Sequence, residues 1–168
     1  MKKILVIGSS GAGKSYFSTK LSEKLNIPVT HLDLIWHKEN HTHISREEFD
    51  EFLEAKFKED QWIMDGDYSR TLEVRIEHAD TIFFLDYPVE VCVEGIKERV
   101  GVKRNDMPWI AEELDESLLN MVENYPQNER IQTLELLKKY KEKNVITFKT
   151  REEANKYTEL AEARNRNR

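Results

Sequence analysis

The sequence has only one cysteine, Cys92, among its 168 residues, so no disulfide can form within the chain. A lone cysteine is typical of proteins from reducing compartments. Long apolar runs are also absent. Nothing approaches the roughly 20 apolar residues of a membrane span, and the apolar run at residues 4–7 is too short for the core of a signal peptide. We therefore expect a cytoplasmic protein that is not embedded in a membrane.

Basic residues are fewer than acidic ones. Lys and Arg together number 26 and Asp and Glu 32, so the formal net charge is −6. This balance argues against a protein that binds nucleic acid over its whole surface, and we interpret the basic end at residues 164–168 as a solvated tail. With 39% hydrophobic residues, a chain of 168 residues is long enough for one well-buried domain and short for two.

Glycine is scarce too, with six residues in the chain, and three of them lie in one short segment directly after the apolar residues 4–7. The segment fits the pattern G-x-x-x-x-G-K-[ST], at the junction of a buried strand and a helix where a phosphate-binding loop is found. The members of this predicted phosphate-binding loop are Gly8, Ser9, Ser10, Gly11, Ala12, Gly13, Lys14 and Ser15.

The residue types of the phosphate-binding loop suit a nucleoside triphosphate. Glycines let consecutive backbone N–H groups turn toward phosphate oxygens, and the positive end of the following helix adds to the field. Lys14 can reach the outer phosphates, and the Ser15 hydroxyl can ligate Mg²⁺. A Gly/Ser-rich turn that binds nothing is the alternative. The apolar strand before the loop and the amphipathic helix after it favour triphosphate binding.

Short apolar segments alternate with helical patterns along the chain. Strands are predicted at residues 2–7, 29–33, 62–65, 81–86 and 144–148. Helices are predicted to begin at residue 14, after a capping box at 45–48, at 88, near 112, near 128 and after a second capping box at 150–153. This order predicts an α/β fold of three layers, with helices on both faces of a parallel sheet. Ligands bind at the carboxyl ends of such strands, where Gly8, Asp33, Asp65 and Asp86 lie.

Two of these strand-end aspartates have predicted roles in chemistry. Asp65 can face the metal that Ser15 holds, directly or through water, because the loop alone would leave the Mg²⁺ shell incomplete. The alternative for Asp65 is a helix N-cap or turn aspartate. Asp33 can orient or deprotonate a hydroxyl acceptor, which benefits from a base, whereas a phosphate acceptor arrives already ionised. The alternative for Asp33 is a cap at the end of its strand.

Arginines are candidates for neutralising phosphoryl charge, because a planar guanidinium matches the geometry of phosphate. A surface ion pair is the competing interpretation for each of them. The candidates are Arg70, Arg75, Arg99 and Arg130.

Several segments resemble the bacterial DNA topology modulation group of adenylate-kinase-like P-loop NTPases. Residues 62–71, a strand followed by D-G and an arginine, carry the closest likeness, and residues 32–36, 84–88, 106–108 and 125–130 add to it. The resemblance covers nearly the whole chain. It implies a single P-loop kinase domain over residues 1–168 with a five-stranded parallel sheet. It also implies an acceptor-binding region at about residues 31–70 and a mobile lid at about 100–127.

The same resemblance implies roles for individual residues. Asp65 is expected on the magnesium side, Arg70 is expected to hold an acceptor phosphate, and Arg99 is expected to neutralise phosphoryl charge. We also predict that Arg99 and Arg130 contact the nucleotide. Asp67 stands where the relatives often carry asparagine. Its carboxylate adds negative charge beside Arg70, which weakens the case for a phosphate-bearing acceptor.

We therefore predict an Mg²⁺-dependent phosphotransferase that uses ATP and a small-molecule acceptor, either a nucleotide or a hydroxylated metabolite. Lys14, Asp33, Arg70 and Arg99 are the predicted catalytic residues. The alternative is a nucleotide-binding regulatory protein or ATPase that influences DNA topology. The acidic balance and the lack of a helix-turn-helix pattern or a basic stripe argue against direct DNA binding.

Overall fold

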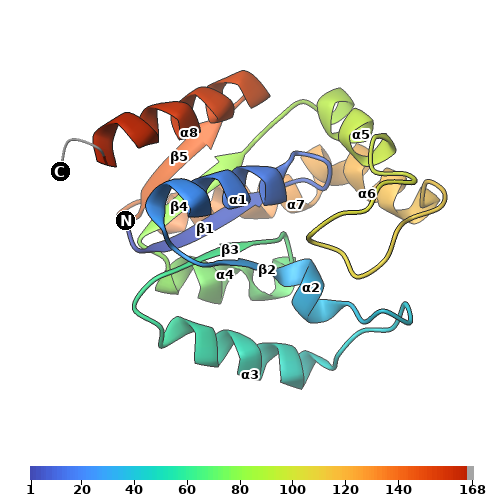
Figure 1. The fold of residues 1–168 in the computed structure, drawn as a ribbon, viewed down its shortest axis with the longest axis horizontal. Coiled ribbons are helices and arrows are strands. Elements are labelled where there is room, and N and C mark those ends of the chain that lie inside the picture. Colours follow the sequence, from blue (N-terminus) through green and yellow to red (C-terminus); the bar gives the residue numbers. More distant parts are fainter. Residues whose placement is uncertain (166–168) are drawn as a thin grey trace.

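Five parallel strands form one sheet in the order β2-β3-β1-β4-β5 (Figure 1). A computed structural model describes the backbone of residues 1–165 and the side chains of residues 1–160. The basic tail predicted at residues 164–168 lies outside these described side chains. The prediction of a five-stranded parallel sheet is confirmed. The strands are β1 (Lys3–Gly8), β2 (Val29–His31), β3 (Trp62–Asp65), β4 (Thr81–Leu85) and β5 (Asn144–Phe148).

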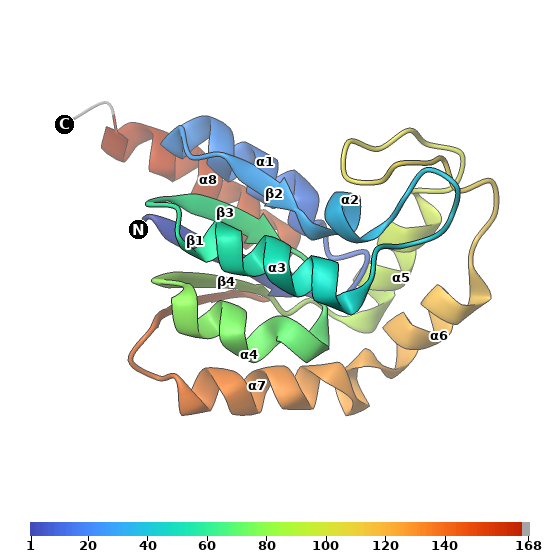
Figure 2. The same ribbon diagram turned by 90° about the horizontal axis from the view of Figure 1, so that it is seen from below.

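Helices cover both faces of the sheet, so the predicted three-layer α/β fold is confirmed. Helices α1 and α8 lie on one face, and α3, α4 and α7 lie on the other (Figures 1 and 2). No helix in the described residues combines the length and the apolar character needed to cross a membrane. The helices are α1 (Lys14–Leu25), α2 (Leu32–Trp36), α3 (Arg46–Phe57), α4 (Ser69–His78), α5 (Val89–Lys97), α6 (Glu116–Asn124), η1 (a 3₁₀ turn, Tyr125–Gln127), α7 (Glu129–Lys139) and α8 (Arg151–Asn165).

Alternating side chains of the central strand β1 build both hydrophobic cores. Ile4 and Val6 pack on the side of α1 and α8, whereas Leu5 and Ile7 pack on the side of α3 and α4. All four are fully buried. Successive side chains of a strand point to opposite faces, so an apolar run of this length supplies both layers. The strand that leads into the phosphate-binding loop is therefore anchored on both sides.

The phosphate-binding loop leaves the sheet between two neighbouring strands. β1 pairs with β3 on one side and with β4 on the other, and the crevice at such a point is the usual ligand site of an open α/β sheet. Gly11 and Gly95 bring the loop and α5 into backbone contact. A Cβ on Gly11 would lie 2.0 Å from the Cys92 carbonyl oxygen, and a Cβ on Gly95 would lie 2.1 Å from the Gly11 carbonyl oxygen. Helix α5 thus fixes the position of the loop.

Two predicted element boundaries are wrong. Residues 29–33 were expected to be extended, but β2 ends at His31 and α2 follows, so Asp33 lies in the first turn of a helix. The reason is that His31 pairs with Asp65, where the neighbouring strand β3 itself ends. The helix expected near residue 112 begins at Glu116, because the Asp115 carboxylate caps it by accepting from two backbone N–H groups.

Candidate functional site

The phosphate-binding loop has a backbone conformation that its glycines permit. Gly11 and Gly13 have φ angles of 82° and 89°, a region that residues with a Cβ rarely adopt. The Lys14 side chain folds back along the loop, where its Nζ donates to the carbonyl oxygens of Gly8 and Ser9 at 2.7 and 3.0 Å. The ammonium group is therefore held at the loop, on the side where the outer phosphates of a nucleotide bind in such loops.

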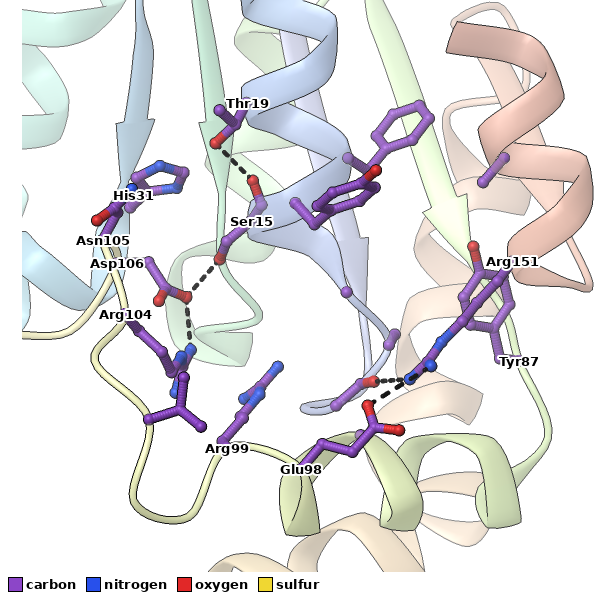
Figure 3. Close-up of a pocket in the computed structure, with 18 of the residues that line it drawn as sticks. Ser15, Thr19, His31, Tyr87, Glu98, Arg99, Arg104, Asn105, Asp106 and Arg151 are labelled. Carbon is purple, nitrogen blue, oxygen red and sulfur yellow. Dashed lines mark hydrogen bonds and ion pairs between the residues drawn. The ribbon is translucent and has the colours of Figure 1, made fainter. Parts of the chain in front are cut away.

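A cavity of about 580 Å³ opens beside the loop, a volume typical of small-ligand sites. Ser15 and Asp106 line one end of it and Arg151 the other, and Arg99 points into the space between them (Figure 3). The Arg151 guanidinium also donates to the Gly11 carbonyl oxygen at 3.2 Å. The cavity thus extends from the Ser15 end of the loop to the first turn of α8.

Ser15 shares its corner of the cavity with a carboxylate from the loop between α5 and α6. Its hydroxyl donates a 2.5 Å hydrogen bond to Oδ2 of Asp106, 91 positions later in the chain (Figure 3). Arg104 donates to the same oxygen at 2.5 Å. Burial opposes ionisation of Asp106, but the hydrogen bond from Ser15 and the charge and hydrogen bond of Arg104 hold the pKa of its carboxyl below its usual value. The corner therefore presents a hydroxyl and an ionised carboxylate, oxygen donors of the kind that Mg²⁺ prefers.

Asp65 ends β3, as predicted, and its carboxylate faces His31 of the neighbouring strand. His31 Nδ1 and Asp65 Oδ2 are 2.6 Å apart, and both side chains are buried or nearly so. Burial alone would lower the pKa of His31, but the hydrogen bond and the charge of Asp65 raise it overall. The metal role of Asp65 stays a prediction, because its hydrogen-bond partner is His31 and the partner of Ser15 is Asp106.

Asp33 is held by Tyr68, which lies between β3 and α4. It accepts a 2.7 Å hydrogen bond at Oδ1 from the Tyr68 hydroxyl. Tyr68 has a φ angle of 25°, outside the regions that residues with a Cβ favour. The buried Arg75 fixes this backbone by donating to the carbonyl oxygens of Gly66, Asp67 and Tyr68 at 2.9, 2.8 and 2.8 Å. Arg75 is thus an internal support of the site, and its guanidinium is already occupied.

Charges of both signs surround the Lys14 ammonium. Burial lowers its pKa, the charges of Asp67, Asp33 and Asp65 oppose that change, and the charge of Arg99 adds to it. Burial also raises the pKa of the Asp67 carboxyl, although the Lys14 charge opposes the rise. The carboxyl ends of β2 and β3 therefore bring three aspartates to the Lys14 side of the loop.

Two of the arginines predicted to act on phosphate, Arg70 and Arg130, do not line the cavity and have carboxylate partners. Arg70 forms a bidentate pair with Asp50 of α3, with N–O distances of 2.7 and 3.0 Å. Arg130 donates to both carboxylate oxygens of Asp86 at 2.7 and 2.9 Å, and Lys149 binds the same carboxylate. The phosphate roles of Arg70 and Arg130 stay predictions, since each would first have to leave its partner.

No family model matches the chain, and no curated protein matches it in sequence. Among solved structures, shikimate kinase from Bacteroides thetaiotaomicron is similar over 95% of this chain and 96% of its own, with a TM-score of 0.58 and 16% identity. Shikimate kinase from Aquifex aeolicus is similar over 96% of both chains, with a TM-score of 0.55 and 22% identity. This chain has the shikimate kinase fold. At these identities the likeness establishes the fold alone, and the resemblance to the DNA topology modulation group stays a prediction.

Several residues of the site were not assigned a role from the sequence. Asp106 contacts Ser15 over 91 positions and Tyr68 contacts Asp33 over 35, so no local spacing indicates either contact. Arg151 joins the cavity because α8 starts beside the phosphate-binding loop, where the Thr150 hydroxyl accepts from the Glu153 backbone N–H. For Asp106, the available signal was its position in the segment 106–108 that carries part of the family resemblance.

Proposed function

We propose that the protein is an ATP-dependent kinase that phosphorylates a hydroxyl group of a small metabolite. One arrangement carries the proposal: the Lys14 ammonium is held at the phosphate-binding loop after β1, and Asp33 lies at the same edge of the sheet, just after β2, where its charge acts on that ammonium. A donor phosphate site and a hydroxyl-binding carboxylate thus adjoin each other. The similar solved structures are named kinases, which supports the same reaction class.

Each group has one task in this mechanism. The loop amides and Lys14 bind the outer phosphates, and Arg99 neutralises charge on the transferred phosphoryl group. Asp33 orients the acceptor hydroxyl and takes its proton, while the acceptor oxygen bonds to the γ-phosphorus and the bond to the departing ADP oxygen breaks. Phosphoryl transfer depends mostly on positioning and charge neutralisation, which are the tasks of these groups.

The donor atoms around Ser15 fit Mg²⁺. Ser15 and Asp106 would hold the ion, with Asp65 as the second carboxylate that the sequence predicts on this side. When bound, Mg²⁺ neutralises charge between the outer phosphates. Within the described residues, no group of three or more His, Cys, Asp and Glu side chains forms a metal site of its own. This suits Mg²⁺, which takes many of its ligands from phosphate and water.

Replacing Lys14 with alanine tests the proposal. In a coupled assay of ADP release across a panel of acceptors, we expect Lys14→Ala to lower turnover by about 10²–10³-fold, the scale for loss of a preorganised charge-stabilising group. We also expect it to abolish the rise in melting temperature that the ATP analogue AMP-PNP produces with Mg²⁺. Lys20→Ala, on the same helix but exposed and paired with Glu23, is the matched control and should keep both properties. Full activity of Lys14→Ala would exclude this mechanism.

The alternative from the sequence, a nucleotide-binding regulator or ATPase that influences DNA topology, predicts a different result. A gel-shift experiment at two salt concentrations would detect direct DNA binding, which weakens as salt rises. Salt-sensitive binding together with ATP use that no acceptor stimulates would favour the regulator. Acceptor-dependent ADP release without DNA binding favours the kinase.

A further inference from the structure

Two short segments form a wall beside Lys14, which we call the acceptor wall and define as residues 31–33 and 65–68. Their contact is close: a Cβ on Gly66 would lie 3.0 Å from the Leu32 Cβ. The Tyr68–Asp33 hydrogen bond of 2.7 Å links the two segments. The Gly66 N–H donates to the Val6 carbonyl oxygen at 3.4 Å, near the end of β1 where the phosphate-binding loop begins. The wall therefore adjoins the place where the phosphoryl group is transferred, and its charges act on the Lys14 ammonium.

The acceptor wall is acidic. Of its three aspartates, Asp65 is paired with His31, and Asp33 accepts a hydrogen bond from the uncharged phenol of Tyr68. The Asp67 side chain accepts no hydrogen bond within the described part of the chain. Two carboxyl groups of the wall thus have no cationic hydrogen-bond partner.

The arginines near the wall are occupied elsewhere. Arg75 donates from all three of its nitrogens to Thr71 and to the carbonyl oxygens of residues 66–68. Arg70 is bound to Asp50, and Arg104 is bound to Asp106. Lys14 and Arg99 remain, and both are committed to the triphosphate in the proposed mechanism. None of these residues therefore offers a free guanidinium to a phosphate or carboxylate group of the acceptor.

Resting on the proposed kinase function, we propose that the acceptor is an alcohol without a phosphate or carboxylate group, either a neutral polyol or an amino alcohol. Asp33 binds the reacting hydroxyl, and Asp67 selects against anions. An anionic group placed beside Asp67 would face a partly buried like charge, which costs affinity in a low-dielectric site. An ammonium or hydroxyl group would instead give Asp67 the hydrogen-bond donor that it lacks.

The inference is tested on protein saturated with AMP-PNP and Mg²⁺. Pentose, hexose and nucleoside scaffolds are each offered in four forms: the neutral alcohol, its amine, its carboxylic acid and its phosphate monoester. Melting temperature reports binding, and ADP release with ATP reports turnover. We expect the largest rise in melting temperature, and the fastest turnover, with a neutral or amine form. In Asp67→Asn, we expect the acid and phosphate forms to bind on the order of tenfold more tightly than in the wild type.

Asp60→Asn is the matched control, since it removes one exposed carboxylate outside the site and should leave the ranking of the four forms unchanged. Three results would overturn the inference: strongest binding of an acid or phosphate form, no response to any form, or a ranking that Asp67→Asn does not alter. The proposed kinase function fails separately, because it requires AMP-PNP to stabilise the wild type and not Lys14→Ala before any acceptor is added.

Discussion

The Tyr68 hydroxyl donates a 2.7 Å hydrogen bond to Asp33, and this contact joins the start of α4 to the first turn of α2. Asp33 is the group that the proposed mechanism uses to orient the acceptor hydroxyl. A hydrogen bond to a charged group contributes about 1.5–3 kcal/mol, and its loss would free the Asp33 carboxylate to move. We expect Tyr68→Phe to lower kcat by about tenfold or more, measured by ADP release with the acceptor that the panel identifies.

The binding of the nucleotide provides the control for Tyr68→Phe. Because Tyr68 belongs to the acceptor wall and not to the phosphate-binding loop, the affinity for AMP-PNP should stay at the wild-type value. Asp33→Asn should lower kcat further, by about 10²–10⁴-fold, the range for loss of a general base. Wild-type kcat in Tyr68→Phe, or an equal loss of AMP-PNP affinity, would contradict the positioning role.

The hydrogen bond between Ser15 and Asp106 predicts which carboxylate binds the metal. With AMP-PNP present, Mn²⁺ can replace Mg²⁺ and its binding can be followed by electron paramagnetic resonance. We expect Asp106→Asn to weaken Mn²⁺ binding by about tenfold, because it removes the negative charge of the carboxylate beside Ser15 and keeps the shape of the side chain.

Measuring Mn²⁺ binding of Asp65→Asn in the same way shows which of the two carboxylates, Asp65 or Asp106, binds the metal. If Asp65→Asn abolishes Mn²⁺ binding and Asp106→Asn leaves it unchanged, the assignment from sequence is correct and the contact seen at Ser15 is not a metal site. Loss in both variants would place both carboxylates in the metal shell.

What the sequence could predict depends on the distance along the chain between the interacting groups. The phosphate-binding loop, residues 8–15, joins β1 to α1. Its glycines, Lys14 and Ser15 lie within these eight consecutive residues, so a local sequence pattern was enough to identify it. The five strands were likewise visible as short apolar runs. The sequence did not indicate the hydrogen-bond partner of Ser15, because Asp106 lies in a distant loop whose path depends on how α5 and α6 pack.

The ion-pair partners of the arginines could not be predicted from the sequence either. In the sequence, Arg70 follows the D-G segment after three intervening residues, and a phosphate contact was expected there. Its side chain instead contacts Asp50, which lies 20 residues earlier on α3. Which carboxylate an arginine meets is decided by helix packing, since α3 and α4 lie side by side on one face of the sheet (Figure 2). Residue type alone therefore identifies candidate arginines but not their partners. Arg99 points into the cavity, and its role on the phosphoryl group stays a prediction.

Arg75 is expected to stabilise the protein rather than to contact substrate. It is fully buried, and burial lowers the pKa of its guanidinium to about 10, so that it stays charged at neutral pH. Arg75→Met would leave the carbonyl oxygens of Gly66, Asp67 and Tyr68 without their donor. We expect the free energy of unfolding to fall by about 3–5 kcal/mol, measured by urea denaturation.

Arg75→Lys tests whether the shape of the guanidinium matters. A lysine keeps the charge but cannot match the planar guanidinium, whose Nη1 and Nη2 reach residues 66–68 and whose Nε reaches Thr71. We therefore expect it to recover less than half of the lost stability. Two results would show that the backbone of the acceptor wall keeps its conformation without the Arg75 hydrogen bonds: full recovery of the unfolding free energy in Arg75→Lys, or a loss below about 1 kcal/mol in Arg75→Met.

The pair of His31 and Asp65 makes stability depend on pH. Burial acts to lower the pKa of His31, but the Asp65 carboxylate raises it above the unfolded value of about 6.5. A histidine with a raised pKa in the folded state stabilises the protein fully below the unfolded pKa, and this contribution disappears as pH rises through the folded pKa. Wild type should therefore exceed His31→Asn in unfolding free energy by more at about pH 5.5 than at about pH 9, as measured by urea denaturation.

Asp65→Asn shows whether the carboxylate is the cause. Without the Asp65 charge, the His31 pKa loses the interaction that raises it, so the destabilisation that His31→Asn causes at acid pH should shrink in the Asp65→Asn background. The four proteins form a double-mutant cycle, and its coupling free energy should be favourable at about pH 5.5 and decrease toward pH 9. A coupling that is constant across this range, or that grows with pH, would mean that His31 is neutral in the folded protein and that the 2.6 Å contact is an uncharged hydrogen bond.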